Sequence, residues 1–281
     1  MIAQDSTHNE SSLYHYTSTE VLYCLLQSAM TTKAEASPSM TFRATNIQFL
    51  NDKSEYQFFV TKLKMDLLRY DEEKYAGKNK EIILRNAQYL AFMKNNLTEP
   101  SVISFCKKSD DLTMWNLYGD HCKGVCLEFD KDKLEQLSDT SLVDCVYISS
   151  DGKLFNDSDL QIALDYLNHI PENPSKLLPP QNWQKIIDLL CYTKNTDYIN
   201  EAECRLIKRS EVYNFTPKHG CIIPYLDVKI PIDALKSITI GPCAENPDMG
   251  ILGIQMMLEQ TMKDKANDIL IIKSNKDFRS I

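Results

Sequence analysis

The sequence has little glycine, and it lacks the motifs in which glycine lets the backbone approach a phosphate or turn sharply. Only 8 glycines occur among 281 residues. The pattern G-x-G-x-x-G is absent, as are G-x-S-x-G and G-x-x-x-x-G-K followed by serine or threonine. These motifs mark Rossmann dinucleotide sites, the nucleophile turn of α/β-hydrolases and P-loop nucleotide sites. The sequence therefore argues against all three classes of protein.

The chain also lacks long apolar runs and paired cysteine motifs. No run of about 18 apolar residues exists, so we predict no membrane-spanning segment. The 9 cysteines show no C-x-x-C spacing and follow no apolar leader, which indicates a reduced, cytoplasmic setting. Cys122 and Cys126 stand beside His121, but no second pair of ligands follows at a suitable spacing, so we predict no metal site.

Basic residues are fewer than acidic ones, 31 against 39. The formal net charge is -8, with 43% hydrophobic and 25% charged residues, as in an ordinary globular protein. A negative chain does not attract a nucleic-acid backbone or an anionic membrane over its whole surface. A local basic patch stays compatible with this composition.

Strand and helix patterns alternate irregularly along the chain. This order predicts an α+β fold with mixed, largely antiparallel sheets and flanking helices. Residues 1–12 are polar and unpatterned and predict a flexible tail, whereas 13–281 predict a single domain. A proline-rich loop between two helical patterns predicts a helical insertion near 151–195. A long strand is expected at 203–215, and helices are expected after capping residues such as Thr17 and Asn246.

The segment NEAECRL, residues 200–206, carries two glutamates and an arginine at alternate positions. In a strand, Glu201, Glu203 and Arg205 would point to one face. One interpretation is a solvated strand face on which the arginine offsets the repulsion between the carboxylates. The other is a carboxylate that stabilises positive charge, either on a sugar ring during bond cleavage or on a basic partner.

Two aromatic clusters can likewise be interpreted either as part of a functional site or as part of the core. In LYHYTS, His15 lies between Tyr14 and Tyr16, and a strand histidine is often a hydrogen-bonded core residue rather than a catalytic one. In MWNLYGD, Trp115 and Tyr118 are three residues apart, so they can stack on a planar ring or pack in the core.

Five blocks in order resemble a large uncharacterised bacterial family. The blocks are LYHYTS, LND with a following glutamate, MWNLYGDHCKGVCLEF, EAECR and SNKDFR. The resemblance runs from about Leu13 to Arg279. Lys53 departs from the pattern, because the family usually has proline after the Asn-Asp pair.

The pattern is also similar to the ADP-ribosyltransferase superfamily, in the branch with a His-Tyr-Glu triad. The resemblance implies that His15 is the first-strand histidine, which binds a ribose hydroxyl of NAD. It implies that Glu203 is the catalytic glutamate and that Glu201 is the general base. Trp115 or Tyr118 would be the aromatic residue that contacts the nicotinamide.

The same resemblance completes a set of residues that contact NAD as a substrate. Tyr16 and Thr17 would flank His15 in the nucleotide site, and Arg205 and Arg279 would meet the pyrophosphate. The acceptor would be RNA or protein, and the activity would be that of a bacterial toxin or phage-defence effector with an antitoxin protein as partner. The alternative is a noncatalytic nucleotide-binding or interaction module.

Overall fold

The computed structural model describes most of the chain and divides it into two compact units. The described residues are 11–32, 38–50, 54–69, 79–92, 100–154, 164–165, 167–168, 188–189, 191–218 and 220–277. The first unit comprises Met1–Thr45, Ser101–Asp144 and Asn200–Ile281, and the second comprises Asn46–Pro100 and Cys145–Ile199. Most of the insertion expected near 151–195 lies outside the described residues, so that boundary stays a prediction.

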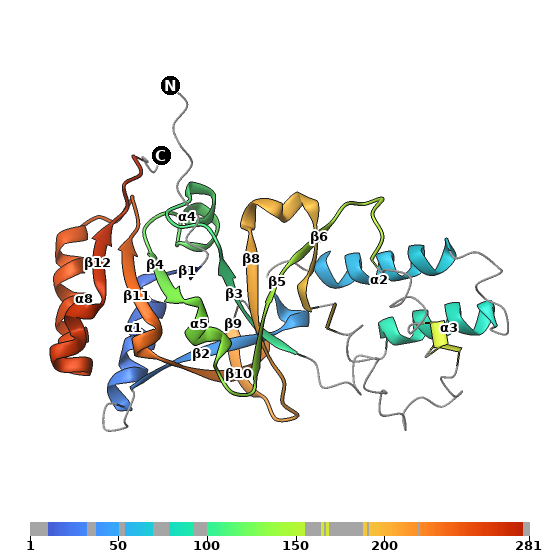
Figure 1. Cartoon of the computed structure of the whole chain (residues 1–281), viewed down its shortest axis with the longest axis horizontal. Helices are drawn as coiled ribbons and strands as arrows, with labels where there is room; N and C mark the ends of the chain where they lie inside the picture. The colour runs from blue at the N-terminus through green and yellow to red at the C-terminus, as the bar shows by residue number, and fades with distance from the viewer. Residues whose placement is uncertain are drawn as a thin grey trace. The chain divides into compact units, whose positions relative to one another are not determined.

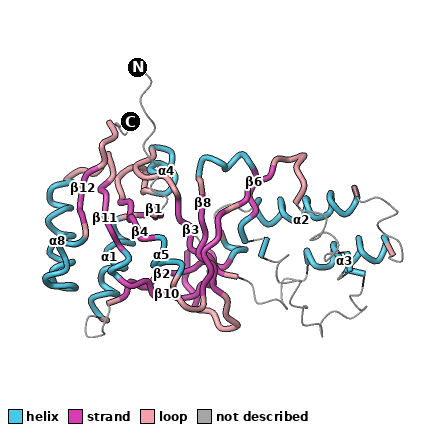
Figure 2. Tube along the Cα trace, in the orientation of Figure 1, coloured by secondary structure: helices cyan, strands magenta, loops and turns pink. Residues whose placement is uncertain are grey.

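A large sheet organises the first unit (Figure 1). Within the described residues it has ten strands, in the order β12-β11-β4-β1-β3-β2-β10-β9, with β8 paired to β3 and β5 paired to β8. The strands are β1 (Ser12–Thr17), β2 (Ser39–Asn46), β3 (Ser101–Cys106), β4 (Val125–Asp130), β5 (Thr140–Asp144), β8 (Glu203–Lys208), β9 (Asn214–Lys218), β10 (Cys221–Pro231), β11 (Leu235–Ile240) and β12 (Leu270–Lys273). β11 and β12 are parallel, whereas β1, β3, β4 and β8 pair antiparallel. The predicted α+β fold is confirmed: helices and strands are intermixed along the chain (Figure 2), and the sheet is mixed and largely antiparallel.

Helices cover both faces of this sheet. They are α1 (Thr19–Thr31), α4 (Leu112–Tyr118), α5 (Lys131–Glu135) and α8 (Pro247–Met262), with 3-10 helices η4 (Thr196–Glu201), η5 (Ile232–Ala234) and η6 (Lys263–Asp268). Residues of α1 and α8 belong to the main hydrophobic core, whereas α4 contributes to a second cluster with Tyr16 and Cys126. In the described part of the chain, no helix is long and apolar enough to cross a bilayer.

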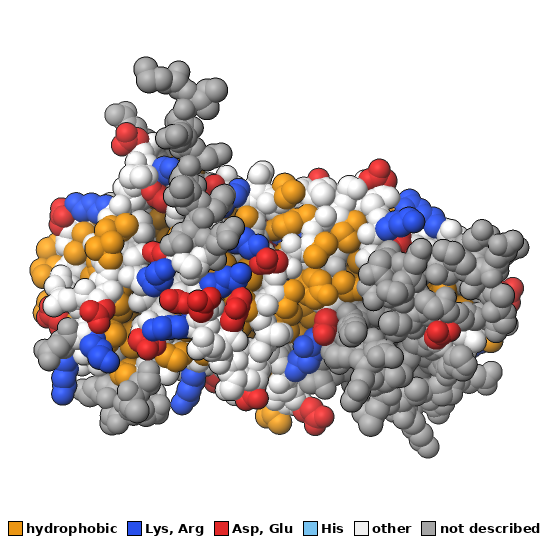
Figure 3. Space-filling view, viewed as in Figure 1, with side chains coloured by type: hydrophobic (Ala, Val, Ile, Leu, Met, Phe, Trp, Pro, Cys, Tyr) orange, Lys and Arg blue, Asp and Glu red, His pale blue; other side chains and the backbone are white. Residues whose placement is uncertain are grey.

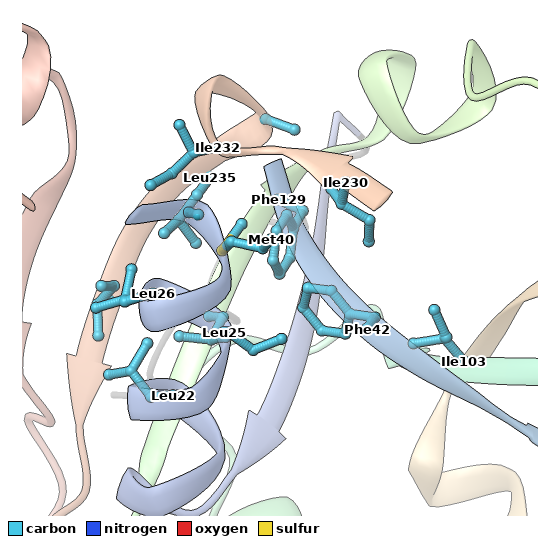
Figure 4. Close-up of a cluster of buried hydrophobic side chains, with 14 of the residues drawn as sticks. Leu22, Leu25, Leu26, Met40, Phe42, Ile103, Phe129, Ile230, Ile232 and Leu235 are labelled. Carbon is cyan, nitrogen blue, oxygen red and sulfur yellow. The ribbon is translucent and has the colours of Figure 1, made fainter. Parts of the chain in front are cut away.

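The main core forms because α1 carries leucines at helical spacing. Leu22, Leu25 and Leu26 are buried and belong to the same hydrophobic cluster as Met40 and Phe129 of the sheet (Figure 4). Burying a leucine side chain stabilises a fold by about 1.5–3 kcal/mol, so this stripe accounts for the docking of α1. The helix begins one residue later than expected: its N-cap is Ser18, whose Oγ accepts a hydrogen bond from the Val21 amide, whereas Thr17 ends β1.

The second unit contains helices α2 (Ser54–Leu68) and α3 (Lys80–Phe92), the 3-10 helix η1 (Ile47–Phe49) and two short parallel strands, β6 (Val146–Ile148) and β7 (Thr193–Asn195). Lys62 is buried, and its Nζ donates to the carbonyls of Ser150 at 2.6 Å and Gly152 at 2.8 Å. Lys194 lies 3.1 Å from the Glu55 carboxylate, and both side chains are buried. Buried cations of this unit are thus matched by hydrogen-bond acceptors, as a low-dielectric interior requires.

The strand expected at 203–215 is two strands with different partners. β8 pairs with β3 and β5, whereas β9 pairs with β10. Five residues, 209–213, separate them and are not part of either strand. Residues 208–211 are all polar, so the apolar–polar alternation stops where the first strand ends, and the prediction of one long strand was wrong.

Two glycines allow a direct test of the packing. At Gly124 a Cβ atom would lie 2.1 Å from the Thr17 carbonyl oxygen, and Thr17 is fixed in the sheet. At Gly253, in the interior of α8, a Cβ atom would meet nothing within 4 Å. We expect Gly124→Ala to lower the free energy of unfolding by about 1–3 kcal/mol or more through overpacking. Gly253→Ala should raise it by about 0.5–1 kcal/mol, since alanine favours helix.

Urea unfolding followed by circular dichroism measures both changes. Each variant is the control of the other, because the chemical change is the same and only the surroundings differ. Equal effects of the two substitutions would contradict the packing around Gly124.

Candidate functional site

Strand pairing decides which of the predicted site residues share a face of the sheet. Tyr14 of β1 pairs with Cys106 of β3, and Cys106 pairs with Glu203 of β8. Directly paired residues of antiparallel strands project to the same side. Tyr14, Cys106 and Glu203 therefore share one face, which we call the carboxylate face.

Glu203 and Arg205 form a buried ion pair on this face. Their exposed fractions are 6% and 1%. Arg205 Nε donates to Glu203 Oε1 at 2.7 Å, and Arg205 Nη2 donates to Oε2 at 3.1 Å. The expected alternation of the strand is confirmed for these two residues. The guanidinium holds both carboxylate oxygens, so the charge of Glu203 is compensated inside the protein.

Glu201 does not follow the strand alternation that the sequence predicted. It is the last residue of η4, and Ala202 adopts a left-handed backbone with φ of 43° before β8 begins. Alternation holds only along continuous extended backbone, so the left-handed residue breaks it. The Glu201 side chain is nevertheless buried, and its Oε1 accepts a 2.7 Å hydrogen bond from the hydroxyl of Tyr118.

The structure separates the two aromatic candidates of α4. Trp115 is fully buried, its Nε1 donates to Asp110 Oδ1 at 2.8 Å, and its ring packs edge-on against Tyr16 at 5.0 Å. Tyr118 is 37% exposed and contacts Glu201. Tyr118 is therefore the aromatic ring of this pair that a ligand can reach. We call Tyr118, Glu201, Glu203 and Arg205 the polar cluster.

Tyr16 and Thr17 lie in the interior. The Tyr16 hydroxyl donates to the Lys108 carbonyl at 2.9 Å and accepts from the Asp111 amide at 3.0 Å. Burial raises the pKa of Tyr16 far above its ordinary value. Both residues are less than a tenth exposed. Tyr16 holds the segment between β3 and α4 against β1, and neither Tyr16 nor Thr17 offers its side chain to solvent.

His15 projects away from the carboxylate face, since it follows Tyr14 in an extended strand. Its ring contacts Phe42 at 5.5 Å and Phe105 at 5.7 Å. Its Nδ1 lies 2.9 Å from the Ser104 carbonyl, an acceptor, so Nδ1 carries the proton. Burial lowers the pKa of His15, which favours the neutral ring. In that form Nε2 is a hydrogen-bond acceptor.

Asp110 is a residue of the site that sequence reasoning missed. Its carboxylate accepts from Trp115 Nε1 at 2.8 Å, from Ser274 Oγ at 2.6 Å and from the Asn275 amide at 3.1 Å. Its backbone is left-handed, with φ of 46°. The carboxylate thereby joins α4 to the segment that follows β12. The only local signal is the pair Asp110-Asp111 before a helix, which marks a cap but not a long-range contact.

Arg279 and Lys53 lie outside the described residues. Among the residues that the structure describes, no group of three or more histidine, cysteine, aspartate or glutamate side chains could hold a metal ion.

Comparison with known proteins identifies one family. Residues 114–206 match the model of a family described as protein of unknown function (DUF2971). The match covers about a third of the chain and contains the MWNLYGD and EAECR blocks. It agrees with the resemblance to an uncharacterised family. The similarity to ADP-ribosyltransferases stays a prediction.

A search of curated proteins and a search of solved structures found no match.

The buried ion pair makes a quantitative prediction about stability. Arg205→Met leaves the Glu203 carboxylate without its counter-ion, and we expect a loss of about 3–5 kcal/mol in the free energy of unfolding. The double variant Glu203→Gln with Arg205→Met should lose less than the sum of the two single variants, because the residues couple. Urea denaturation of all four proteins completes this double-mutant cycle.

Lys107 and Asp144 provide the matched control. Their atoms are 2.7 Å apart, but the side chains are 42% and 54% exposed. Exposed pairs contribute about 0.2–1 kcal/mol, so the cycle with Lys107→Met and Asp144→Asn should show the smaller coupling. A coupling at Glu203 and Arg205 no larger than this would refute the buried-pair interpretation.

The neutral state of His15 predicts a pH dependence. The unfolded chain binds a proton at His15 near the ordinary pKa of 6.5, whereas the folded chain does so at lower pH. The contribution of neutral His15 to the free energy of unfolding is therefore complete above the ordinary pKa of 6.5, and it decreases as the pH falls below that pKa. Between about pH 7.5 and about pH 5.5, the wild type should lose up to about 1.4 kcal/mol per pH unit more than His15→Asn.

The other four histidines are common to both proteins, so their contributions cancel in the comparison. Asparagine also keeps a donor for the Ser104 carbonyl. Parallel stability profiles of the two proteins across this range would show that His15 is not held neutral.

Proposed function

We propose that the chain is a NAD-dependent ADP-ribosyltransferase and that the polar cluster is its reaction site. The observation that carries the proposal is the exposed ring of Tyr118 hydrogen-bonded to the buried carboxylate of Glu201, with Glu203 two residues further along the chain. A flat ring bonded to one carboxylate, with a second carboxylate two residues along the chain, offers the components that cleavage of a ribosyl bond needs: a surface for the leaving base and negative charge for the sugar.

The reaction begins with the bond between nicotinamide and C1 of the ribose. Nicotinamide leaves with the bonding electron pair, and positive charge develops on the ribose. The Glu203 carboxylate stabilises this charge more in the transition state than in the ground state, which is the condition for catalysis. Arg205 holds both oxygens of this carboxylate, which fixes its orientation for that role.

The acceptor nucleophile then bonds to C1 of the ribose and releases a proton. Glu201 takes this proton as general base, and the Tyr118 hydroxyl fixes the orientation of that carboxylate. Arg205 acts as a positioning residue in this scheme, because its guanidinium is buried against Glu203. Arg279 is retained as the candidate for the pyrophosphate.

His15 receives a positioning role. Its Nδ1 donates to the Ser104 carbonyl, and Ser104 pairs with Arg205 across β3 and β8. His15 thereby fixes the strand beside the ion pair from the opposite face of the sheet, so it receives no contact with NAD at the polar cluster. Tyr16, Thr17 and Trp115 support the backbone of the site and receive no contact with NAD.

The biological class is proposed from the resemblance. A bacterial toxin or phage-defence effector would modify RNA or protein and would be held inactive by an antitoxin protein. Over β4, β11 and α5, basic and acidic side chains lie side by side (Figure 3), as in the pairs Lys131 with Glu135 and Lys133 with Asp233. This part of the surface favours neither acceptor.

A noncatalytic nucleotide-binding module is the second candidate. It is favoured by the double contact of Arg205 with Glu203, which occupies one acceptor site on each carboxylate oxygen. In such a module the carboxylates would accept hydrogen bonds from ribose hydroxyls, and no bond of the nucleotide would be cleaved. Turnover distinguishes the two candidates, since binding alone leaves NAD intact.

The test is incubation of the purified chain with radiolabelled NAD and cell lysate, followed by nuclease or protease treatment of the labelled product. Glu203→Gln should lower label transfer by about 100-fold or more, because it removes the charge that stabilises the transition state. Tyr118→Phe should lower it by about tenfold or more, since a hydrogen bond to a charged group contributes about 1.5–3 kcal/mol. Circular dichroism verifies that each variant is folded.

Glu128→Gln is the matched control. Glu128 lies on the carboxylate face but is bonded to Ser12 and Ser237, at 2.7 Å each. Label transfer should survive in this variant. NAD that binds to the wild type and is recovered intact would select the noncatalytic module, and neither binding nor turnover would contradict both candidates.

A further inference from the structure

Two cysteines meet where the turn after α4 contacts the loop before α8. The Cys243 amide donates to the Cys122 carbonyl at 2.9 Å. A backbone hydrogen bond of this kind brings two Cα atoms to roughly 5–6 Å, within the range of about 4.4–6.8 Å found in disulfides. The Cys243 thiol is also near enough to raise the pKa of the Cys122 thiol, so the two side chains lie close together.

The surroundings of the pair are closely fixed. The turn holds three successive residues in the left-handed region: Asp120, His121 and Cys122, with φ of 49°, 51° and 69°. The Cys122 amide donates to the Trp115 carbonyl at 3.1 Å. Gly241 adds to this contact, because a Cβ atom there would lie 2.3 Å from the Cys122 carbonyl oxygen. The two segments cannot drift apart without breaking these contacts.

The thiols differ in access. Cys122 is fully buried, whereas Cys243 is partly exposed. Burial raises the pKa of Cys122, and the neighbouring Cys243 thiol raises it further. An oxidant from solution therefore meets Cys243 first, and Cys122 is placed to react second.

We propose that Cys122 and Cys243 are a redox-responsive dithiol that a peroxide converts into an intramolecular disulfide. The Cys243 thiolate attacks one peroxide oxygen, the O–O bond breaks, and a sulfenic acid and water form. The Cys122 sulfur then attacks the Cys243 sulfur, the S–O bond breaks, and a second water leaves. Two thiols are oxidised, one peroxide is reduced, and both thiol protons end in water.

The disulfide joins the turn that follows Tyr118 to the loop that begins α8. It fixes the strained turn covalently, so oxidation and reduction change how rigidly the end of α4 is held. The proposal does not rest on a transferase activity. It requires only the contact between the two segments.

Cys106 and Cys126 provide a contrast within the same cluster of buried residues. They lie on β3 and β4, which flank β1 on opposite sides. One strand between them implies a separation of roughly 10 Å, which exceeds the reach of a disulfide. Cys24 and Cys221 are exposed and represent freely accessible thiols.

The experiment treats the reduced full-length chain with a small excess of hydrogen peroxide, then denatures it and alkylates the remaining thiols for intact-mass analysis. The oxidised wild type should carry two fewer alkyl groups than the 9 of the reduced chain. Peptide mapping should show Cys122 linked to Cys243, and dithiothreitol should restore full alkylation.

Two variants sharpen the outcome. Cys243→Ser should keep every remaining cysteine alkylated, whereas the variant with Cys24→Ser and Cys221→Ser should still lose two. Full alkylation of the oxidised wild type would overturn the proposal. So would a disulfide that maps to any other pair, including Cys106 with Cys126.

Discussion

The register of β1 between β3 and β4 is the constraint on which the site depends. It pairs Tyr14 with Cys106 on one side and with Glu128 on the other. A shift of one residue would move every side chain of β1 to the opposite face. In the observed register, Tyr14 and Tyr16 face α4 and the carboxylates, while Leu13 and His15 face the aromatic core. The strand thus contacts the main hydrophobic core on one face and the second buried cluster on the other.

Left-handed backbone positions gather around the polar cluster. Asp110 precedes α4, Asp120 through Cys122 follow it, and Ala202 precedes β8. Such conformations cost free energy in residues other than glycine and persist only where the surrounding contacts determine them. Here the contacts are visible: Asp110 receives three hydrogen bonds, and Glu201 is held by Tyr118. The chain has few glycines, so polar contacts rather than glycine stabilise its sharp turns.

Periodicity in the sequence was sufficient where the backbone is regular. The leucines of α1, the α+β class and the shared face of Glu203 and Arg205 all follow from spacing. The predicted position of the Glu201 side chain was wrong, because residue alternation assumes extended backbone and Ala202, which follows Glu201, is left-handed. It left Trp115 and Tyr118 unresolved, since a spacing of three on a short helix does not say which ring turns inward. Asp110 was missed because its partners are 164 and 165 positions away in the chain.

The burial of the ion pair limits what the polar cluster can do. Arg205 is 1% exposed and is held against a carboxylate, so it cannot move into solvent to capture a phosphate without leaving Glu203 uncompensated. Tyr118, which is partly exposed and bonded to Glu201, is therefore the member of the polar cluster that solvent can reach. In the proposed function the ligand would stack on Tyr118, which is bonded to Glu201, whereas Glu203 is already held on both oxygens by Arg205.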